Sequence, residues 1–300
     1  MQESCVRIGG ATVFYDLGVS NYESLLSALT PYGLERYMPD RKTPAACLKV
    51  ALNEVMKGQA PKGKKVVIRP QEDRENSFAV GWIPSKVRED DNEESFEHQF
   101  FGHLVGGTES SDIRCSPYQE FVDALRNPFD CALHSVSKAS LSSAIVDIIE
   151  NVLHGISLRD SGGFYWIPES QISAWKCLAS AIETTVTKGG THTFHCISAV
   201  ADDAMVAAVC DAVESETISR LSTLEKSVAK SSDSFSVQNC QAKWELCEKC
   251  RQRVASFETL LSRPMSALHD AITQTERMCA LTALQTTGAQ MAETDTLAAA

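Results

Sequence analysis

The sequence has no uninterrupted apolar run of the roughly 18 to 20 residues that a membrane span needs. Its first residues, MQESCVRIGG, also lack the basic stretch and apolar core of a secretory signal. Basic residues are outnumbered, because 28 Lys and Arg stand against 39 Asp and Glu, a formal net charge of −11 at pH 7. That charge argues against a whole-surface affinity for nucleic acid or anionic membrane, since both are polyanions. We therefore expect a cytoplasmic protein without a membrane partner.

A cysteine pattern typical of disulfides or of zinc is also missing. The eleven cysteines are odd in number and scattered, and most stand in apolar surroundings, as Cys47, Cys177 and Cys210 do. In a reducing compartment such residues act as small hydrophobic side chains. The sequence therefore predicts buried thiols.

Helix signals are clear in the first part of the chain. Ser20 and Glu23 have the spacing of a capping box and predict a short helix to about residue 29. Thr43 followed by Pro44 predicts a second helix that ends before Gly58. Helical spacing of apolar residues predicts further helices from about residue 116, over residues 141–154 and over residues 172–186.

Strand signals lie between these helices. Residues 64–70 and 78–84 flank a polar loop, as the two strands of a hairpin would, and residues 95–105 follow an acidic loop as a third strand. The stretch DSGGFYWIPES, residues 160–170, raises the question of whether its glycines bind phosphate. A phosphate loop places glycines after a strand and before a helix, whereas Gly162 and Gly163 are predicted to end a helix and begin a strand. We therefore expect a β-α-β unit from residue 163 to 197, turned at its start by these glycines.

From Asp202 onward strand signals and glycine almost vanish, and long helices are predicted. One apolar series runs from Met205 to Val228, and a second runs from Cys240 to Ile272 in steps of three and four. Pro264 should kink or restart the second helix. Residues at this spacing form an apolar stripe along one face of a helix, and such a stripe needs another protein surface to cover it.

The sequence thus predicts an α+β fold in a chain of 300 residues, 43% hydrophobic and 22% charged. A mixed domain with a small sheet is expected over residues 1–200. Long C-terminal helices, as a helical hairpin or coiled coil, are expected over residues 201–285. A disordered tail is expected over residues 286–300.

Two clusters suggest metal chemistry. Cys247 and Cys250 form a CxxC, with Cys240 about two helical turns before them. A structural zinc needs four ligands, so these three thiols would need one more, and burial as packing residues is the simpler interpretation. In THTFHC, strand geometry puts His192 and Cys196 on one face and turns His195 away, which weakens a catalytic or metal hypothesis.

A local basic patch suggests nucleic acid. The run from Lys57 to Arg69 could contact phosphates, and Phe78 or Trp82 on the adjoining strand could stack on bases. The alternative is a sheet edge protected by lysines. The candidate contacts to phosphate are Lys62, Lys64, Lys65 and Arg69.

The order of a TPAACLKVALNEV helix, a GGFYWIP strand and long C-terminal helices resembles uncharacterised phage and bacterial proteins of unknown function. This resemblance implies no activity and no catalytic residues. Our leading hypothesis is a non-enzymatic interaction or assembly protein that uses its C-terminal helices, with a protein partner or a second copy. The alternatives are a nucleic-acid-associated protein that uses the basic hairpin, residues 57–69, and a metal-dependent enzyme that holds zinc.

Overall fold

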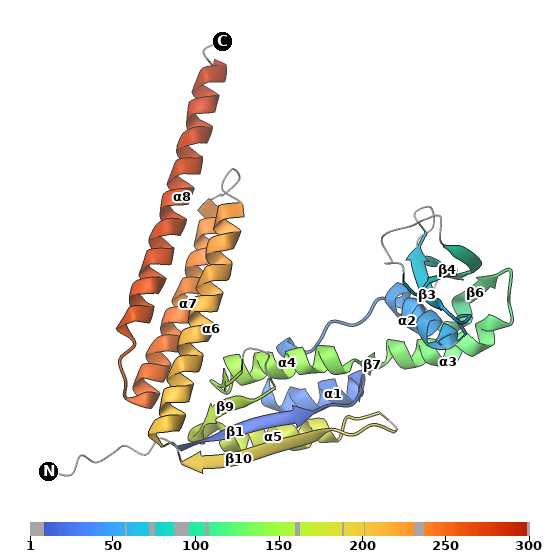
Figure 1. Ribbon diagram of the computed structural model, residues 1–300, viewed down its shortest axis with the longest axis horizontal. Helices are drawn as coiled ribbons and strands as arrows, with labels where there is room; N and C mark the ends of the chain where they lie inside the picture. Colours follow the sequence, from blue (N-terminus) through green and yellow to red (C-terminus); the bar gives the residue numbers. More distant parts are fainter. Residues whose placement is uncertain are drawn as a thin grey trace. The chain divides into compact units, whose positions relative to one another are not determined.

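The computed structural model (Figure 1) confirms the α+β fold class. It describes residues 9–57, 59–71, 76–86, 96–105, 108–159, 163–187, 189–200, 202–230 and 237–298, without the side chains of residues 199–200, 237–238 and 287–298. The acidic loop, residues 89–94, and Gly162 lie outside the described residues. None of the described helices has the length and apolar character required to cross a membrane.

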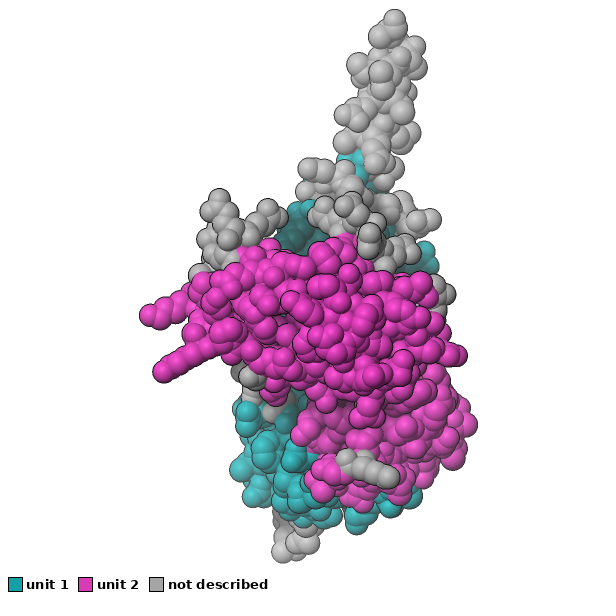
Figure 2. All heavy atoms as spheres, turned by 90° about the vertical axis from the view of Figure 1, so that its right-hand side faces the viewer, with its two compact units in different colours: residues 1–16, 146–180, 193–300 teal, residues 17–145, 181–192 magenta. Residues whose placement is uncertain are grey.

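The chain forms two compact units, each assembled from separate stretches of sequence (Figure 2). Unit 1 contains residues 1–16, 146–180 and 193–300, and unit 2 contains residues 17–145 and 181–192. A linear boundary near residue 200 is predicted from the sequence, and α6 (Asp203–Lys230) begins close to it. The compact units differ from that linear division, because the first strand of the chain belongs with the C-terminal helices.

The sheet of unit 1 is four-stranded, with the order β10-β1-β9-β8 and antiparallel neighbours. Its strands are β1 (Gly9–Asp16), β8 (Ile156–Ser157), β9 (Tyr165–Pro168) and β10 (Thr193–Val200). Because β9 and β10 both run antiparallel to β1, they are parallel to each other and are joined through α5 (Ile172–Glu183). The predicted β-α-β unit is therefore present, but it is split by β1, a strand that the sequence did not predict.

In the DSGGFYWIPES stretch, Gly163 has a different role from the one predicted. The preceding helix, α4 (Lys138–Asn151), ends before β8, and it is His154 that has a left-handed φ of 51° there. Gly163, with φ 91°, lies in the connection between β8 and β9, where the Leu158 N–H donates to the Phe164 carbonyl at 2.9 Å. The expected glycine cap at a helix end is wrong, because a strand pair intervenes.

Aromatic side chains cover both faces of β9. On one face Tyr15 stacks on Tyr165 with ring centroids 6.3 Å apart, and Trp175 of α5 packs nearby. On the other face Trp166 is 1% exposed and packs against Phe257 at 6.4 Å. A Cβ at position 10 would lie 2.4 Å from the Trp166 ring, so the strand beside it needs glycine there.

The rest of unit 1 is formed by α6, α7 (Val237–Leu261) and α8 (Ser266–Ala298), which lie side by side (Figure 1). Three helices thus replace the predicted hairpin, and the predicted break at Pro264 is confirmed between α7 and α8. The helix α8 continues to Ala298, through the segment predicted as a tail. The two apolar series meet in one core with Ile156 and Trp166, although Ile218 and Trp244 stay about half exposed. This core contains Val209, Val213, Leu221, Leu224, Val228, Cys240, Cys247, Cys250, Val254, Phe257, Leu261, Leu268, Ile272, Cys279 and Ala283.

Unit 2 holds the second four-stranded sheet, in the order β3-β4-β5-β6. The predicted hairpin and third strand are confirmed. The strands are β3 (Lys64–Pro70), β4 (Ser77–Pro84), β5 (Glu97–Leu104) and β6 (Ile113–Ser116), and they share a core with α2 (Pro44–Met56) and α3 (Phe121–Leu133).

Local capping fixes the helix starts in unit 2. The Ala46 N–H donates to Thr43 Oγ1 at 3.2 Å, so the predicted start of α2 is confirmed. In α1 (Tyr22–Leu29) the cap is Asn21, whose Oδ1 accepts from the Ser24 N–H, and the predicted capping box at Ser20 is wrong. Ser20 instead belongs to β2 (Ser20–Asn21), which pairs with β7 (Ser135–Val136). Short 3-10 helices cover Thr30–Tyr32, Glu35–Tyr37, Ser110–Asp112 and Glu169–Gln171.

Candidate functional site

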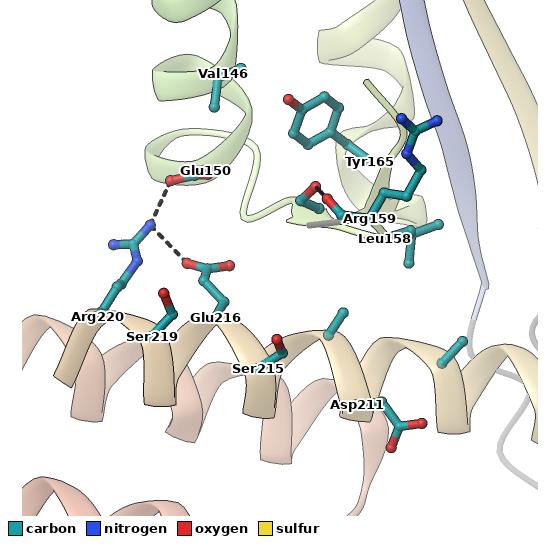
Figure 3. Close-up of a pocket in the computed structure, with 13 residues that line it drawn as sticks. Val146, Glu150, Leu158, Arg159, Tyr165, Asp211, Ser215, Glu216, Ser219 and Arg220 are labelled. Atoms are coloured by element: carbon teal, nitrogen blue, oxygen red, sulfur yellow. Dashed lines mark hydrogen bonds and ion pairs between the residues drawn. The ribbon is translucent and has the colours of Figure 1, made fainter. Parts of the chain in front are cut away.

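A cavity of about 1000 Å³ opens in unit 1 between the end of α4, the β8 segment and α6 (Figure 3). Its walls combine hydroxyl and charged groups. They include Glu150, Ser157, Arg159, Tyr165, Asp211, Ser215, Glu216, Ser219 and Arg220. Sequence reasoning did not find this cavity, because its residues come from two stretches more than forty positions apart.

An ionic network forms the floor of the cavity. Arg220 Nη2 lies 2.6 Å from Glu150 Oε2 and 2.7 Å from Glu216 Oε1, so one guanidinium bridges two carboxylates (Figure 3). Arg253 Nη2 lies 3.0 Å from the second oxygen of Glu216. The same arginine donates to the backbone carbonyls of Glu150 and Gly155, at 2.8 and 2.7 Å. Arg253 therefore fastens α7 to the end of α4 and to the start of β8.

Opposing effects act on the pKa of Glu150 in this network. Burial raises the pKa of Glu150, the charge of Glu216 raises it further, and Arg220 and Arg253 oppose both effects. A raised carboxyl pKa in a cavity is one mark of an acid-base catalyst. Here the carboxylates of Glu150 and Glu216 are already paired with guanidinium groups. This pairing favours a structural role for the network, in which it holds α4, α6 and α7 together.

Unit 2 contains a buried serine-histidine pair. Ser20 Oγ lies 2.9 Å from His192 Nε2, and the Gly18 N–H donates to Nδ1 of the same ring at 3.0 Å. Since Nδ1 accepts a hydrogen bond, the proton of the neutral ring is on Nε2, and the ring donates to Ser20. Ser20 then donates to Thr185, whose hydroxyl donates to the Ile182 carbonyl at 2.8 Å.

This pair is arranged for structure and not for nucleophilic attack. A histidine that activates a serine needs an unprotonated nitrogen facing the hydroxyl. The Gly18 amide fixes the opposite tautomer, and burial lowers the pKa of His192, which keeps the ring neutral.

The other two candidate residues of THTFHC, His195 and Cys196, have different neighbours. His195 stacks on Phe14 with ring centroids 4.5 Å apart. Burial raises the pKa of the Cys196 thiol, the opposite of what a nucleophile needs.

The three candidate zinc ligands lie in the core of the C-terminal helices. Cys247 is 0% exposed, and Cys240 and Cys250 are 9% exposed. Burial, followed by the neighbouring Cys279, raises the pKa of Cys247 to about 12, whereas a zinc ligand must be a thiolate. In the described part of the chain no group of three or more His, Cys, Asp or Glu side chains is placed to hold a metal ion. Zinc at these thiols stays a prediction, and Cys279 of α8 is the neighbour that the sequence spacing did not reveal.

The basic hairpin is only partly available to phosphate. Lys64 Nζ lies 2.5 Å from Glu97 Oε1, and the Arg69 guanidinium lies 4.7 Å from the centroid of the Phe96 ring. Lys62 is exposed, and Lys65 is half-buried. Phe78 and Trp82 are each 8% exposed and belong to the core of unit 2. Their predicted role in base stacking is therefore wrong.

Comparison with protein families gives a match over most of the chain. Residues 12–293 match a family of unknown function (DUF6744). The chain belongs to this family. Comparison with curated proteins and with solved structures gives no match. Membership of the family of unknown function assigns no substrate, partner or catalytic residue, so the functional argument rests on the geometry described above.

Proposed function

We propose that this member of the family is a non-enzymatic interaction or assembly protein that acts through its C-terminal helices. A second copy of the chain is its simplest partner. The earlier resemblance to phage and bacterial proteins belongs to the same proposal and suggests that setting.

The observation that carries the proposal is the apolar surface left on these helices after their core is filled. Leu284 is 70% exposed and Leu281 is 59% exposed, the two highest values among the large exposed hydrophobic residues that the structure describes. The two leucines are three residues apart and therefore share a face of α8. On α7, Trp244 is 50% exposed and Leu246 is 45% exposed. Such groups favour contact with another protein surface.

The polar sites favour this proposal over an enzyme. The histidine of the buried Ser20–His192 pair carries its proton on the nitrogen that faces the serine. Two carboxylates of the cavity, those of Glu150 and Glu216, are bridged by Arg220. Both arrangements stabilise the fold, and neither presents an activated group to a substrate.

The basic hairpin gives less support to the nucleic-acid alternative. Its best-placed lysine, Lys64, is neutralised by Glu97, and its two aromatic candidates are buried. Electrostatic attraction by the remaining cations must also overcome a net charge of −11.

The test is light scattering of the full chain and of the double variant Leu281→Gln/Leu284→Gln. We expect the average mass of the wild type to rise with concentration and that of the double variant to rise less. Val50→Gln is the matched control, because Val50 is a 40% exposed apolar residue on a different helix, α2. An unchanged mass in the double variant would remove the α8 surface from the proposal.

A further inference from the structure

The edges of the two four-stranded sheets differ in how they are protected. An edge strand has one row of unpaired backbone groups, and natural proteins block it with charge, proline or short length. In unit 2, β3 carries Lys64, Lys65, Arg69 and Pro70, and β6 has four residues with an arginine among them. In unit 1, β8 has only two residues.

The edge strand β10 lacks all of these protections. It is eight residues long, TFHCISAV, without a charged residue, a proline or a glycine. On one side it pairs with β1 along its whole length, from Gly9↔Val200 to Asp16↔Thr193. In the part of the chain that the structure describes, no strand pairs with its other side. Threonine, phenylalanine and isoleucine also favour strand pairing.

The side chains of β10 extend an apolar row to this edge. Phe14 and Thr12 of β1 lie opposite His195 and Ile197, so these side chains share one face of the sheet. Phe14 stacks on His195 at 4.5 Å and lies 5.0 Å from Phe164, measured between ring centroids. The row ends at Ile197, which is 57% exposed.

We propose that β10 pairs antiparallel with β10 of a second copy of this chain, so that the two sheets become one continuous sheet. A two-fold axis at Cys196 sets His195 of one copy opposite Ile197 of the other, and the reverse. This register covers the exposed Ile197 twice and continues the aromatic row across the axis. It places no like charges opposite each other, because the strand has none.

The second copy fits this edge better than a foreign peptide does. Recognition of a foreign strand by augmentation takes its specificity from side-chain pockets or charges beside the edge. The β10 strand offers no charge, and its alternating residues complement those of an identical strand. This surface is separate from the α8 surface of the proposed function, so the two can be tested independently.

The experiment combines hydrogen exchange and mass measurement on the full chain. In the wild type, amides of residues 193–200 should exchange more slowly at high than at low protein concentration, while those of β3 should not change. Ile197→Lys, at an exposed position, should abolish this dependence and lower the average mass. Val105→Lys is the matched control, because Val105 is 54% exposed and follows β5.

The outcomes separate the two surfaces. Exchange in β10 that is independent of concentration in the wild type would overturn the pairing, whatever the mass. A mass that falls with Leu281→Gln/Leu284→Gln and not with Ile197→Lys would support the helices alone and overturn the strand pairing. Far-ultraviolet circular dichroism of Ile197→Lys checks that the variant folds. If the variant does not fold, the concentration dependence of hydrogen exchange in the wild type alone tests the strand pairing.

Discussion

The two long edge strands of this chain, β3 and β10, show opposite solutions to one physical problem. The β3 edge carries three cations and a proline, and Lys64 is paired with Glu97 of β5. The β10 edge is one residue longer and carries no charge. The same chain therefore contains a protected edge and an open one. We infer that the charges on β3 prevent pairing, and that their absence from β10 permits it.

The two units also bury polar groups differently. Unit 1 contains a partly buried ionic network in which Arg253 and Arg220 pair with Glu216 and Glu150. Unit 2 buries a neutral chain of hydrogen bonds through His192 and Ser20. The neutral state of His192 is lost when its ring takes up a proton. The stability of unit 2 should therefore fall in mild acid.

The largest expected effect concerns the sheet of unit 1. Trp166→Ala removes a 1% exposed ring that packs on Phe257, and it should lower the free energy of unfolding by about 3 to 5 kcal/mol. Chemical denaturation measures this loss. Hydrogen exchange should show faster opening in β1 and β9, with little change in β3 and β4.

Trp166→Phe sharpens this result. The indole N–H of Trp166 has no hydrogen-bond partner among the described residues, so phenylalanine removes an unsatisfied donor while it keeps most of the apolar surface. We expect a clearly smaller loss than with alanine. Equal losses in the two variants would mean that the ring is not the anchor of this sheet.

The next effect separates two arginines on α7. Arg253→Met removes the donors to the carbonyls of Glu150 and Gly155, and it should cost about 1.5 to 3 kcal/mol in the free energy of unfolding. Arg251→Met is the control, because Arg251 is 32% exposed and pairs with Glu276 at the surface, where a loss of about 0 to 1 kcal/mol is expected. Similar losses in both variants would contradict the role of Arg253 as a clamp.

A smaller effect depends on pH. Burial lowers the pKa of His192 below its ordinary value, with Glu183 opposing and Lys138 adding to the shift. As the pH falls below about 6.5, the unfolded chain takes up a proton that the folded ring still refuses. The contribution of neutral His192 to stability is therefore fully present above this pH, and it is lost as the pH falls towards the pKa of His192 in the folded chain.

His192→Gln tests this dependence. We expect the free energy of unfolding of the wild type to decrease as the pH falls below about 6.5, and that of the variant to decrease less. If both chains lose stability in parallel, another group titrates and the neutral tautomer is not the cause.

The smallest effect on stability concerns the protected edge. Lys64→Thr/Lys65→Thr should change the free energy of unfolding by no more than about 1 kcal/mol, because both side chains are partly exposed and the ion pair of Lys64 with Glu97 is open to solvent. It should nevertheless create concentration-dependent association, measured by light scattering. Lys62→Thr is the control, since Lys62 precedes the strand. Association that stays unchanged in the double variant would break the comparison between the edges.

Local signals in the sequence predicted much of the fold. The Thr43 cap with Pro44 defined α2, two apolar segments on either side of a polar loop defined the β3 and β4 hairpin, and Pro264 separated α7 from α8. The strand β1 was missed, because its sequence GGATVFYD opens with two glycines and its partners lie about 150 to 190 positions further along the chain. The turn at Gly163 was misjudged for a related reason, since the two-residue strand β8 is too short to leave a pattern.

The candidate sites were harder to predict, because they depend on contacts between distant residues. Ser20 and His192 are 172 positions apart, and no local pattern joins them. Arg253 gave a weak signal as a charged residue beside the apolar stripe of α7. The burial of Cys240, Cys247 and Cys250, in contrast, followed from their spacing along that stripe. The same prediction for Cys177 is wrong, because its side chain is exposed, and Cys210 is only partly buried.

The most direct test of the assembly proposal is sedimentation velocity of the wild-type chain over a wide range of concentration. We predict that the weight-average mass exceeds that of one chain and rises with concentration, because two copies of the chain bind each other. A sedimentation profile of a single chain at every concentration would contradict it.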